Sequence, residues 1–166
     1  MSAQGLWKRA STVNMAFTLT SPAFVEGETI PLQYSCDGHN LAPPLVWSDP
    51  PEDTRGFALI MDDPDAPSGT FTHWVLYDIP ATARRLADQS LGTALQNDFG
   101  RAAYGGPCPP VGHGAHRYVF TLYAVDVPSL TLKGITRKAL ERALQTHTLG
   151  TSRLMGRYER KSKRSR

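Results

Sequence analysis

Short apolar or alternating runs, separated by segments rich in proline and glycine, divide most of the chain into candidate β-strands. Residues 56–61 and 117–125 are largely apolar and rich in β-branched and aromatic residues, which is typical of buried strands. Shorter or alternating runs predict further strands at residues 17–21, 29–34, 45–47, 72–79 and 152–158. Pro31 favours a sheet edge for the run that contains it. Residues 81–103 show no clear period, so we expect a long loop with weak local structure there.

One helix is predicted towards the C-terminal end of the chain. Thr136 is a suitable N-cap, and Ile135 and Leu140 have the spacing of a hydrophobic staple. One face of the helix continues through Leu140, Ala143, Leu144 and His147. Gly150 is expected to end the helix.

The composition supports a β-rich globular domain. At 166 residues, 40% of them hydrophobic, the chain can form one domain with a substantial core. Its 13 prolines and 14 glycines are more than a helical protein would carry. We therefore predict a mainly β domain over residues 15–158, with one or two short helices near its C-terminal end.

The basic charge is concentrated at one end. Residues 157–166 hold six Lys or Arg and one Glu, so their net charge is +5. Because the whole chain has a net charge of +3, residues 1–156 together carry −2. We expect residues 159–166 to form a disordered basic tail. The alternative is non-specific contact between this tail and an anionic surface, such as a membrane or nucleic acid.

Cys36 and Cys108 form neither a metal-binding pattern nor a redox pair close in sequence. Two free thiols and one disulfide both fit the sequence. No apolar run approaches the roughly 18 residues of a membrane-spanning helix, and residues 1–14 lack the apolar core of a secretory signal. We expect these 14 residues to be a flexible extension, with Met15 as an alternative start, and the compartment to be the cytoplasm.

Candidate chemistry lies in two loops that lead into strands. Residues 104–118 contain four glycines and three prolines and end with His116 and Tyr118 at the start of a core strand. The other loop offers Asp63 and Asp65, followed by His73. Aspartates in such loops are often only turn residues, and these histidines could be structural. Because both loops are stiff and feed strands, we predict a preformed site.

These residues resemble a known family. Asp-Pro-Asp-Ala-Pro-Ser at 63–68, His73, Gly-Gly-Pro-Cys-Pro-Pro at 105–110 and His-Arg-Tyr at 116–118 are similar to the phosphatidylethanolamine-binding protein family, in particular its bacterial Raf-kinase-inhibitor-like branch. Residues 36–47 also fit, and the resemblance runs from about residue 17 to 158. It implies a Greek-key β-sandwich of two antiparallel sheets, with a small anion-binding cavity at one end.

The resemblance also implies a set of ligand-binding residues: Asp63, His73, Gly106, Pro109, Pro110, His116 and Tyr118. Supporting neighbours would be Asp65, Pro67, Phe71 and Cys108. The ligand would be a small phosphate ester, of the phosphoethanolamine type, or another anion. This chain departs from the pattern at Pro107, which removes a backbone donor, and lacks the longer eukaryotic insertion after Ser68, so regulation of a kinase cascade is not carried over.

Elementary chemistry agrees with an anion site. Histidine titrates near neutral pH, and a carboxylate beside it favours the imidazolium, which has an N–H for an oxyanion. We hypothesise that Asp63 orients His73 or His116 and that the imidazoles, with Tyr118, hold the anion.

Other functions fit the sequence less well. Ser68 lacks the Gly-x-Ser-x-Gly pattern of a nucleophile elbow, so we predict no catalysis. Asp63, His73 and His116, with His113 nearby, could imitate a two-histidine, one-carboxylate metal site, but we predict no metal or cofactor. The main alternative is an inhibitor that docks a protease or kinase through surface loops such as residues 81–103. Bacterial relatives are often homodimers, so that assembly is a further expectation.

Overall fold

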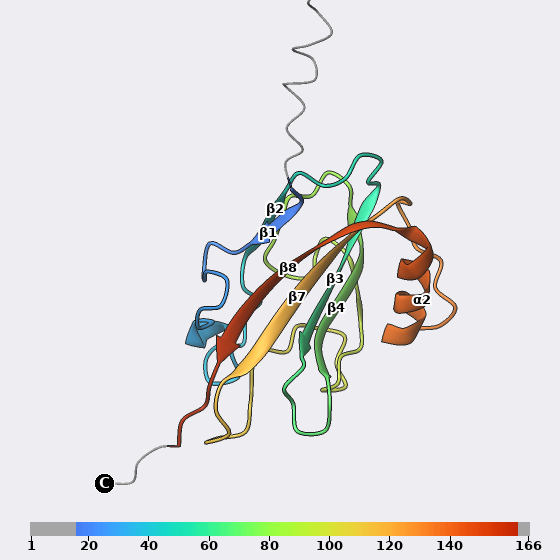
Figure 1. Cartoon of the computed structure of the whole chain (residues 1–166). Helices are drawn as coiled ribbons and strands as arrows, with labels where there is room; N and C mark the ends of the chain where they lie inside the picture. The colour runs from blue at the N-terminus through green and yellow to red at the C-terminus, as the bar shows by residue number, and fades with distance from the viewer. Residues whose placement is uncertain (1–15, 163–166) are drawn as a thin grey trace, which may run out of the picture.

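The computed structural model describes residues 16–162. Within these residues, eight strands, one 3-10 helix and one α-helix follow one another (Figure 1): β1 (Thr18–Thr20), η1 (Leu32–Tyr34), β2 (Leu45–Ser48), β3 (Gly56–Asp63), β4 (Phe71–Pro80), β5 (Arg85–Leu86), β6 (Thr93–Leu95), β7 (His116–Val125), α2 (Arg137–His147) and β8 (Thr148–Tyr158). The predicted extension at residues 1–14 and the end of the predicted tail, residues 163–166, lie outside the described residues.

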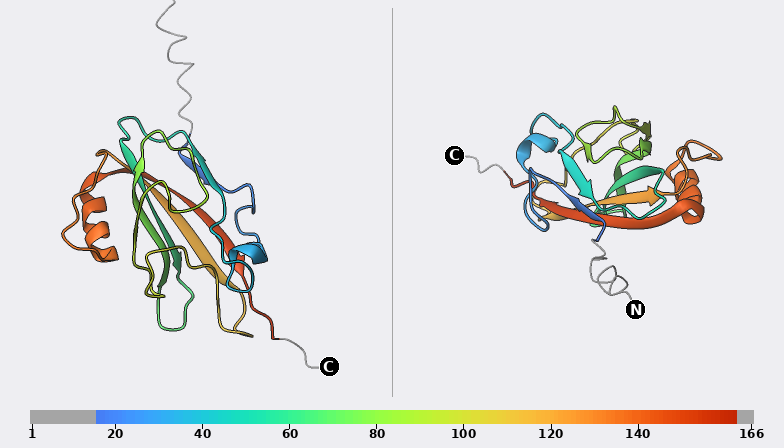
Figure 2. Two further views of the ribbon diagram at one scale, coloured as in Figure 1. Left: turned by 180° about the vertical axis from the view of Figure 1, so that it is seen from behind. Right: turned by 90° about the horizontal axis from the view of Figure 1, so that it is seen from above.

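The strands form two antiparallel sheets that pack face to face. The small sheet has the order β1-β2-β5 and the large sheet the order β6-β4-β3-β7-β8. After β4 the chain crosses to the small sheet as β5, returns to the large sheet beside β4 as β6, and then crosses to the other side of β3 as β7. This gives the Greek-key β-sandwich implied by the resemblance. In Figure 2 the small sheet and α2 lie on opposite sides of the large sheet.

Alternation along β3 divides the large sheet into two faces. Phe57, Leu59 and Met61 belong to the core between the sheets, whereas Ala58 and Ile60 pack towards α2. A residue such as Asp63 therefore faces the sandwich side, and Asp62 faces the helix side. There Arg137 of α2 forms an ion pair with Asp62 and donates to the Thr72 hydroxyl at 2.6 Å.

Two secondary-structure predictions are wrong in part. Residues 29–34 do not form a strand: Thr29 makes an isolated bridge to Arg157, and Pro31, which has no N–H for a ladder, is the N-cap of η1. The segment 81–103 was predicted to be an irregular loop, but it contains β5 and β6. Both strands are only two or three residues long, which is too short for a visible period.

The helix begins as predicted and ends differently. The Thr136 side chain accepts a hydrogen bond from the Ala139 backbone N–H at 3.2 Å. The staple is absent, because Ile135 is 79% exposed. Gly150 does not end the helix, since β8 already begins at Thr148; a Cβ at Gly150 would meet the Pro51 ring at 2.9 Å, so this glycine permits close packing instead. Within residues 16–162, no helix is long and apolar enough to cross a membrane.

Candidate functional site

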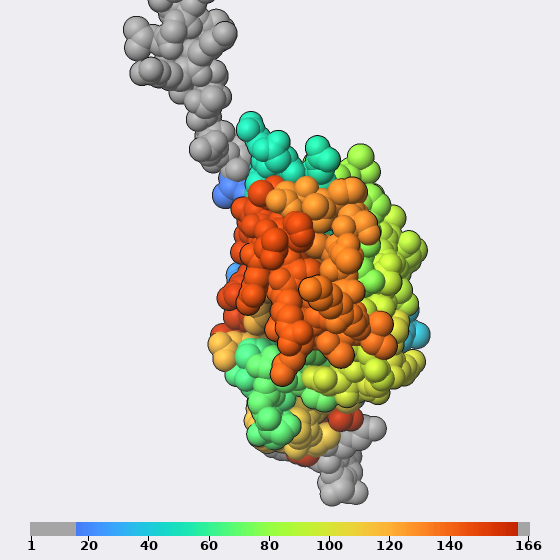
Figure 3. All heavy atoms as spheres, turned by 90° about the vertical axis from the view of Figure 1, so that its right-hand side faces the viewer, coloured from blue at the N-terminus to red at the C-terminus, as the bar shows by residue number. Residues whose placement is uncertain are grey.

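The two predicted loops meet at one end of the molecule. Figure 3 shows the turn between β3 and β4 beside the segment that leads into β7. Arg117 joins them: its backbone N–H and Nε donate to Asp65 Oδ2 at 2.9 and 3.0 Å, and its Nη2 donates to Oδ1 at 2.7 Å. These bonds lower the pKa of Asp65 to about 2. Asp65 thus fixes the position of one loop relative to the other.

A β-bulge brings His73 to the sandwich face. Met61 pairs with Trp74, but the next residue, Asp62, pairs with Thr72, so β4 has one residue more than β3 at this point. Regular alternation would place His73 on the same side as Val75, towards α2. His73 is itself the additional, unpaired residue, and the bulge places its ring in contact with the Tyr118 ring, with the two centroids 5.2 Å apart.

Asp63 and His116 form a buried pair on that face. His116 Nδ1 donates to Asp63 Oδ2 at 2.7 Å, and the two side chains are only 3% and 5% exposed. The Asp65 backbone N–H donates to the other carboxylate oxygen at 2.8 Å. The remaining nitrogen of His116, Nε2, lies 2.7 Å from His113 Nδ1. Asp63 therefore orients His116, as hypothesised, but the nitrogen expected to face an anion contacts His113.

The Tyr118 hydroxyl lies inside this cluster, close to the Asp63 carboxylate and the Cys108 backbone, but makes no hydrogen bond of normal length and angle within residues 16–162. Tyr118 is fully buried, and its oxygen is one of four buried side-chain polar atoms, among the described residues, that make no hydrogen bond. Burial raises the pKa of this phenol, and the Asp63 carboxylate raises it further. The hydroxyl therefore keeps its proton near neutral pH and can donate a hydrogen bond to a bound group.

His73 is held by backbone and by aromatic rings. Its Nδ1 lies 2.7 Å from the Gly105 carbonyl oxygen, which can only accept, so this nitrogen carries the proton. Phe71 and Phe99 pack against the ring with centroids at 5.2 and 5.1 Å. Burial lowers the pKa of His73, although the Gly105 carbonyl opposes the shift. The neutral ring thus presents a bare Nε2 as an acceptor.

The loop before β7 is tied to the segment after η1. Cys36 and Cys108 form a disulfide, with their Cα atoms 5.4 Å apart, which decides between the two alternatives left open by the sequence. The Cys36 backbone N–H donates to the Pro107 carbonyl at 3.1 Å, and Gly106 N–H donates to Asn40 Oδ1 at 2.7 Å. A Cβ on Gly106 would collide with backbone of the facing segment, so only glycine fits there.

A cavity of about 330 Å³ opens along this loop. Its walls are formed by the disulfide and by Asn40, Asn97, Phe99, Arg101, Tyr104, Gly105 and Gly106. Gly105 and Phe99 also contact His73, so the cavity and the buried cluster share a wall. The exposed Arg101 is the cation of this cavity lining.

The structure brings together most of the predicted residues. Asp63, His73, His116 and Tyr118 form the cluster; Gly106 and Cys108 line the cavity; Asp65 and Phe71 support the cluster from outside. Pro109 is buried in the loop, while Pro67 and Pro110 are exposed. The ligand-binding role of this set stays a prediction.

Two contributors were missing from the predicted set. His113 was considered only as a metal ligand, and its spacing from His116 was the available signal. Asn97 is 5% exposed; its Nδ2 donates to the His73 carbonyl at 3.1 Å and to the Ala103 carbonyl at 2.8 Å. Its only signal was an Asn-Asp-Phe-Gly sequence in a segment predicted to be irregular.

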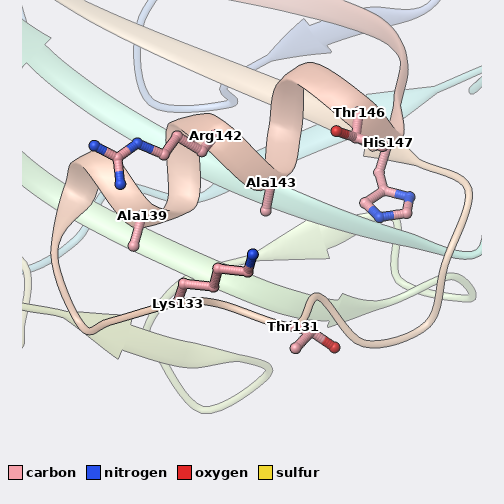
Figure 4. Close-up of a pocket in the computed structure, with 7 residues that line it drawn as sticks. All are labelled: Thr131, Lys133, Ala139, Arg142, Ala143, Thr146 and His147. Carbon is pink, nitrogen blue, oxygen red and sulfur yellow. The ribbon is translucent and has the colours of Figure 1, made fainter.

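A metal centre and a cavity beside α2 are the other places where a site could lie. Across residues 16–162, no group of three or more His, Cys, Asp or Glu side chains is arranged to hold a metal ion. A second cavity, of about 290 Å³, lies against α2 and is lined by Lys133, Arg142 and His147 among others (Figure 4). It is on the far side of the large sheet from Asp63, and His147 there already bonds Asp126 at 2.8 Å.

Comparison with known proteins agrees with this geometry. The family model described as phosphatidylethanolamine-binding protein matches residues 20–159, which include both loops and every strand of the large sheet. The chain belongs to this family.

Relatives and solved structures of the phosphatidylethanolamine-binding family extend the match. A UPF0098 protein of Aquifex aeolicus is 49% identical over 148 residues, which are 84% of this chain and 86% of that protein. The crystal structure of a phosphatidylethanolamine-binding protein homologue from Chlamydia trachomatis has a TM-score of 0.80 at 38% identity and covers 87% of this chain and 98% of its own. YbcL of E. coli, described as a member of the mammalian family, has a TM-score of 0.80 at 30% identity, with 87% and 99% covered.

Proposed function

We propose that the protein binds a small phosphate-type anion at the Asp63–His73–His116–Tyr118 cluster and takes up protons as it does so. Membership of the phosphatidylethanolamine-binding family supports a ligand-binding or regulatory role in general. The observation that carries the specific proposal is the fully buried Tyr118 hydroxyl, which has no partner in the described part of the chain and adjoins His73. Buried polar groups normally have partners, so an empty donor in a cluster of titratable groups points to a ligand.

Proton uptake follows from the charges of the cluster. With neutral imidazoles, the Asp63 carboxylate gives the cluster a negative charge. His73 Nε2 and His116 Nε2, the second of which is bonded to His113, are then both acceptors, which disfavours an anion. A proton on His73 Nε2 turns that acceptor into a donor, and a second proton on His116 balances Asp63. An anion can then accept from His73, from His116 and from the Tyr118 hydroxyl.

The cavity beside the cluster provides space for an organic substituent on the phosphate. Because it shares a wall with His73, a substituent on the phosphate can lie along Phe99 and Tyr104, and Arg101 can contact a second acidic group. A phosphate ester with a small organic group, including one of the phosphoethanolamine type, has this shape. No catalytic step is part of the proposal.

Calorimetry with sulfate tests it. Sulfate remains a dianion throughout the range from pH 5.5 to 8, so the pH dependence of its affinity reports on the protein. Titrations in two buffers of different ionisation enthalpy count the protons taken up. We expect tighter binding at pH 6 than at pH 8, with net proton uptake. Binding with no pH dependence and no uptake would contradict the proposal.

The variant Tyr118→Phe distinguishes this proposal from the alternative function, an inhibitor that docks a protease or kinase through surface loops. Docking through residues 81–103 should survive Tyr118→Phe, whereas sulfate binding should not.

A further inference from the structure

The nitrogen of His116 that a ligand needs is occupied by a side chain of the same protein. One ring nitrogen donates to Asp63, and the other, Nε2, lies 2.7 Å from His113 Nδ1, with the ring centroids 5.0 Å apart. One proton sits between the two imidazoles. An anion can therefore reach His116 only if His113 moves away.

His113 is placed so that it can move while His116 stays. His116 is 2% exposed and lies in β7, whereas His113 is exposed and precedes the strand. It stands between Gly112 (φ 76°) and Gly114 (φ 92°), and a Cβ on either glycine would meet no atom within 4 Å. Such glycines permit large backbone rotations without collision.

Few contacts hold this segment. Gly112 N–H donates to the Arg160 carbonyl at 2.8 Å, and His113 N–H donates to the Pro110 carbonyl at 3.1 Å. Both bonds are made by the backbone, so the imidazole can rotate away from His116 without breaking them. Asp63 continues to hold the His116 ring when His113 leaves.

We propose that His113 is a displaceable cap on the ligand site, which bonds His116 Nε2 in the unliganded protein and is exchanged for the bound anion. The inference rests on the proposed function and adds a regulation to it. The cap satisfies a buried nitrogen while the site is empty, and it lowers the affinity because each binding event must break the His113–His116 bond. It also selects ligands, since a weak acceptor cannot displace the imidazole.

The experiment is sulfate titration at pH 6 of the wild-type protein and of His113→Ala, with His39→Ala as the control for loss of an exposed histidine. A typical net hydrogen bond corresponds to a few-fold change in affinity, so we expect His113→Ala to bind about three- to tenfold more tightly. The His39→Ala variant should bind like the wild type. In the absence of sulfate, the His116 ring ¹⁵N resonances should shift in His113→Ala only.

The other outcomes are separable. If His113 merely fastens the loop, His113→Ala melts at a lower temperature and binds sulfate equally or less tightly, which overturns the cap and keeps the proposed function. If His113 is itself a ligand contact, binding weakens although stability is unchanged, which also overturns the cap. If the wild type and both variants fail to bind sulfate, phosphate or phosphoethanolamine, the proposed function fails and the cap fails with it.

Discussion

Removing the Tyr118 hydroxyl should stabilise the unliganded protein and damage its site. A buried polar group without a partner costs about 1–3 kcal/mol, so Tyr118→Phe should raise the free energy of unfolding by roughly 1 kcal/mol, the low end, since phenylalanine keeps the ring contacts with His73. For a protein of this size, 1 kcal/mol corresponds to about 2–4 °C in melting temperature. A hydrogen bond to a charged ligand contributes about 1.5–3 kcal/mol, so sulfate affinity should fall by roughly 10- to 150-fold.

The chain offers a matched control of opposite sign. The Tyr158 hydroxyl accepts from the Ser35 hydroxyl at 2.9 Å and donates to Asp37 at 2.6 Å. Tyr158→Phe leaves both groups without this partner and should lower the melting temperature by several degrees, while sulfate binding stays within about twofold of wild type. Urea unfolding and thermal melts without ligand measure both variants. If Tyr118→Phe is destabilised as much as Tyr158→Phe, the Tyr118 hydroxyl has a partner in the empty protein, and the argument for a ligand is refuted.

Three further predictions concern His73, the disulfide and Asn97. Burial lowers the pKa of His73, so the unfolded chain takes up this proton at a higher pH than the folded protein; the stability that His73 contributes should be full above about pH 6.5 and fall as the pH decreases towards the lowered pKa. His73→Gln should reduce the pH dependence of the free energy of unfolding over this range, and an unchanged slope would show that other groups cause it. The disulfide closes a segment of 72 residues, so its reduction with dithiothreitol should lower the free energy of unfolding by about 4 kcal/mol according to the loop-entropy model. An unshifted urea midpoint after reduction would contradict this. Asn97→Ala should lower the free energy of unfolding by roughly 2–3 kcal/mol, because it removes a hydrogen-bond partner from the His73 and Ala103 carbonyls. Substitution of the exposed neighbour, Gln96→Ala, should change it by less than about 0.5 kcal/mol, and equal effects of the two would show that these hydrogen bonds do not stabilise the fold.

The sequence was sufficient to predict the elements whose pattern of apolar and polar residues follows their burial or whose ends are set by local contacts. Strand β3 has an apolar run because both of its faces are covered, and the N-cap at Thr136 is a local interaction between residues three apart. The loops that feed the site could be located because proline and glycine restrict the backbone in a way that depends little on the rest of the fold. The pairing of Asp63 with an imidazole was likewise expected from their chemistry.

What the sequence lacked were features set by distant partners. Whether Cys36 reaches Cys108, and whether Ile135 finds Leu140, depends on tertiary geometry rather than on spacing. Asn97 gained its role because its amide meets the backbone of β4, 24 residues away. The spacing of three residues suggested that His113 and His116 lie close together. It could not predict that their ring nitrogens bond to each other, because this depends on the backbone conformation of the loop.

The bulge in β4 makes the site depend on strand length as well as on residue identity. His73 faces Tyr118 because β4 carries one residue more than β3 between the pairs Met61–Trp74 and Asp62–Thr72. The additional residue is His73 itself, which lies between Thr72 and Trp74 and has no partner in β3. In a relative without the bulge, a histidine of β4 would occupy a paired position and follow regular alternation, so a histidine paired beside Val75 would face α2 and the cluster would lose a member. Insertions and deletions in this strand are therefore as informative for tracing the proposed ligand site through evolution as substitutions of the histidine itself.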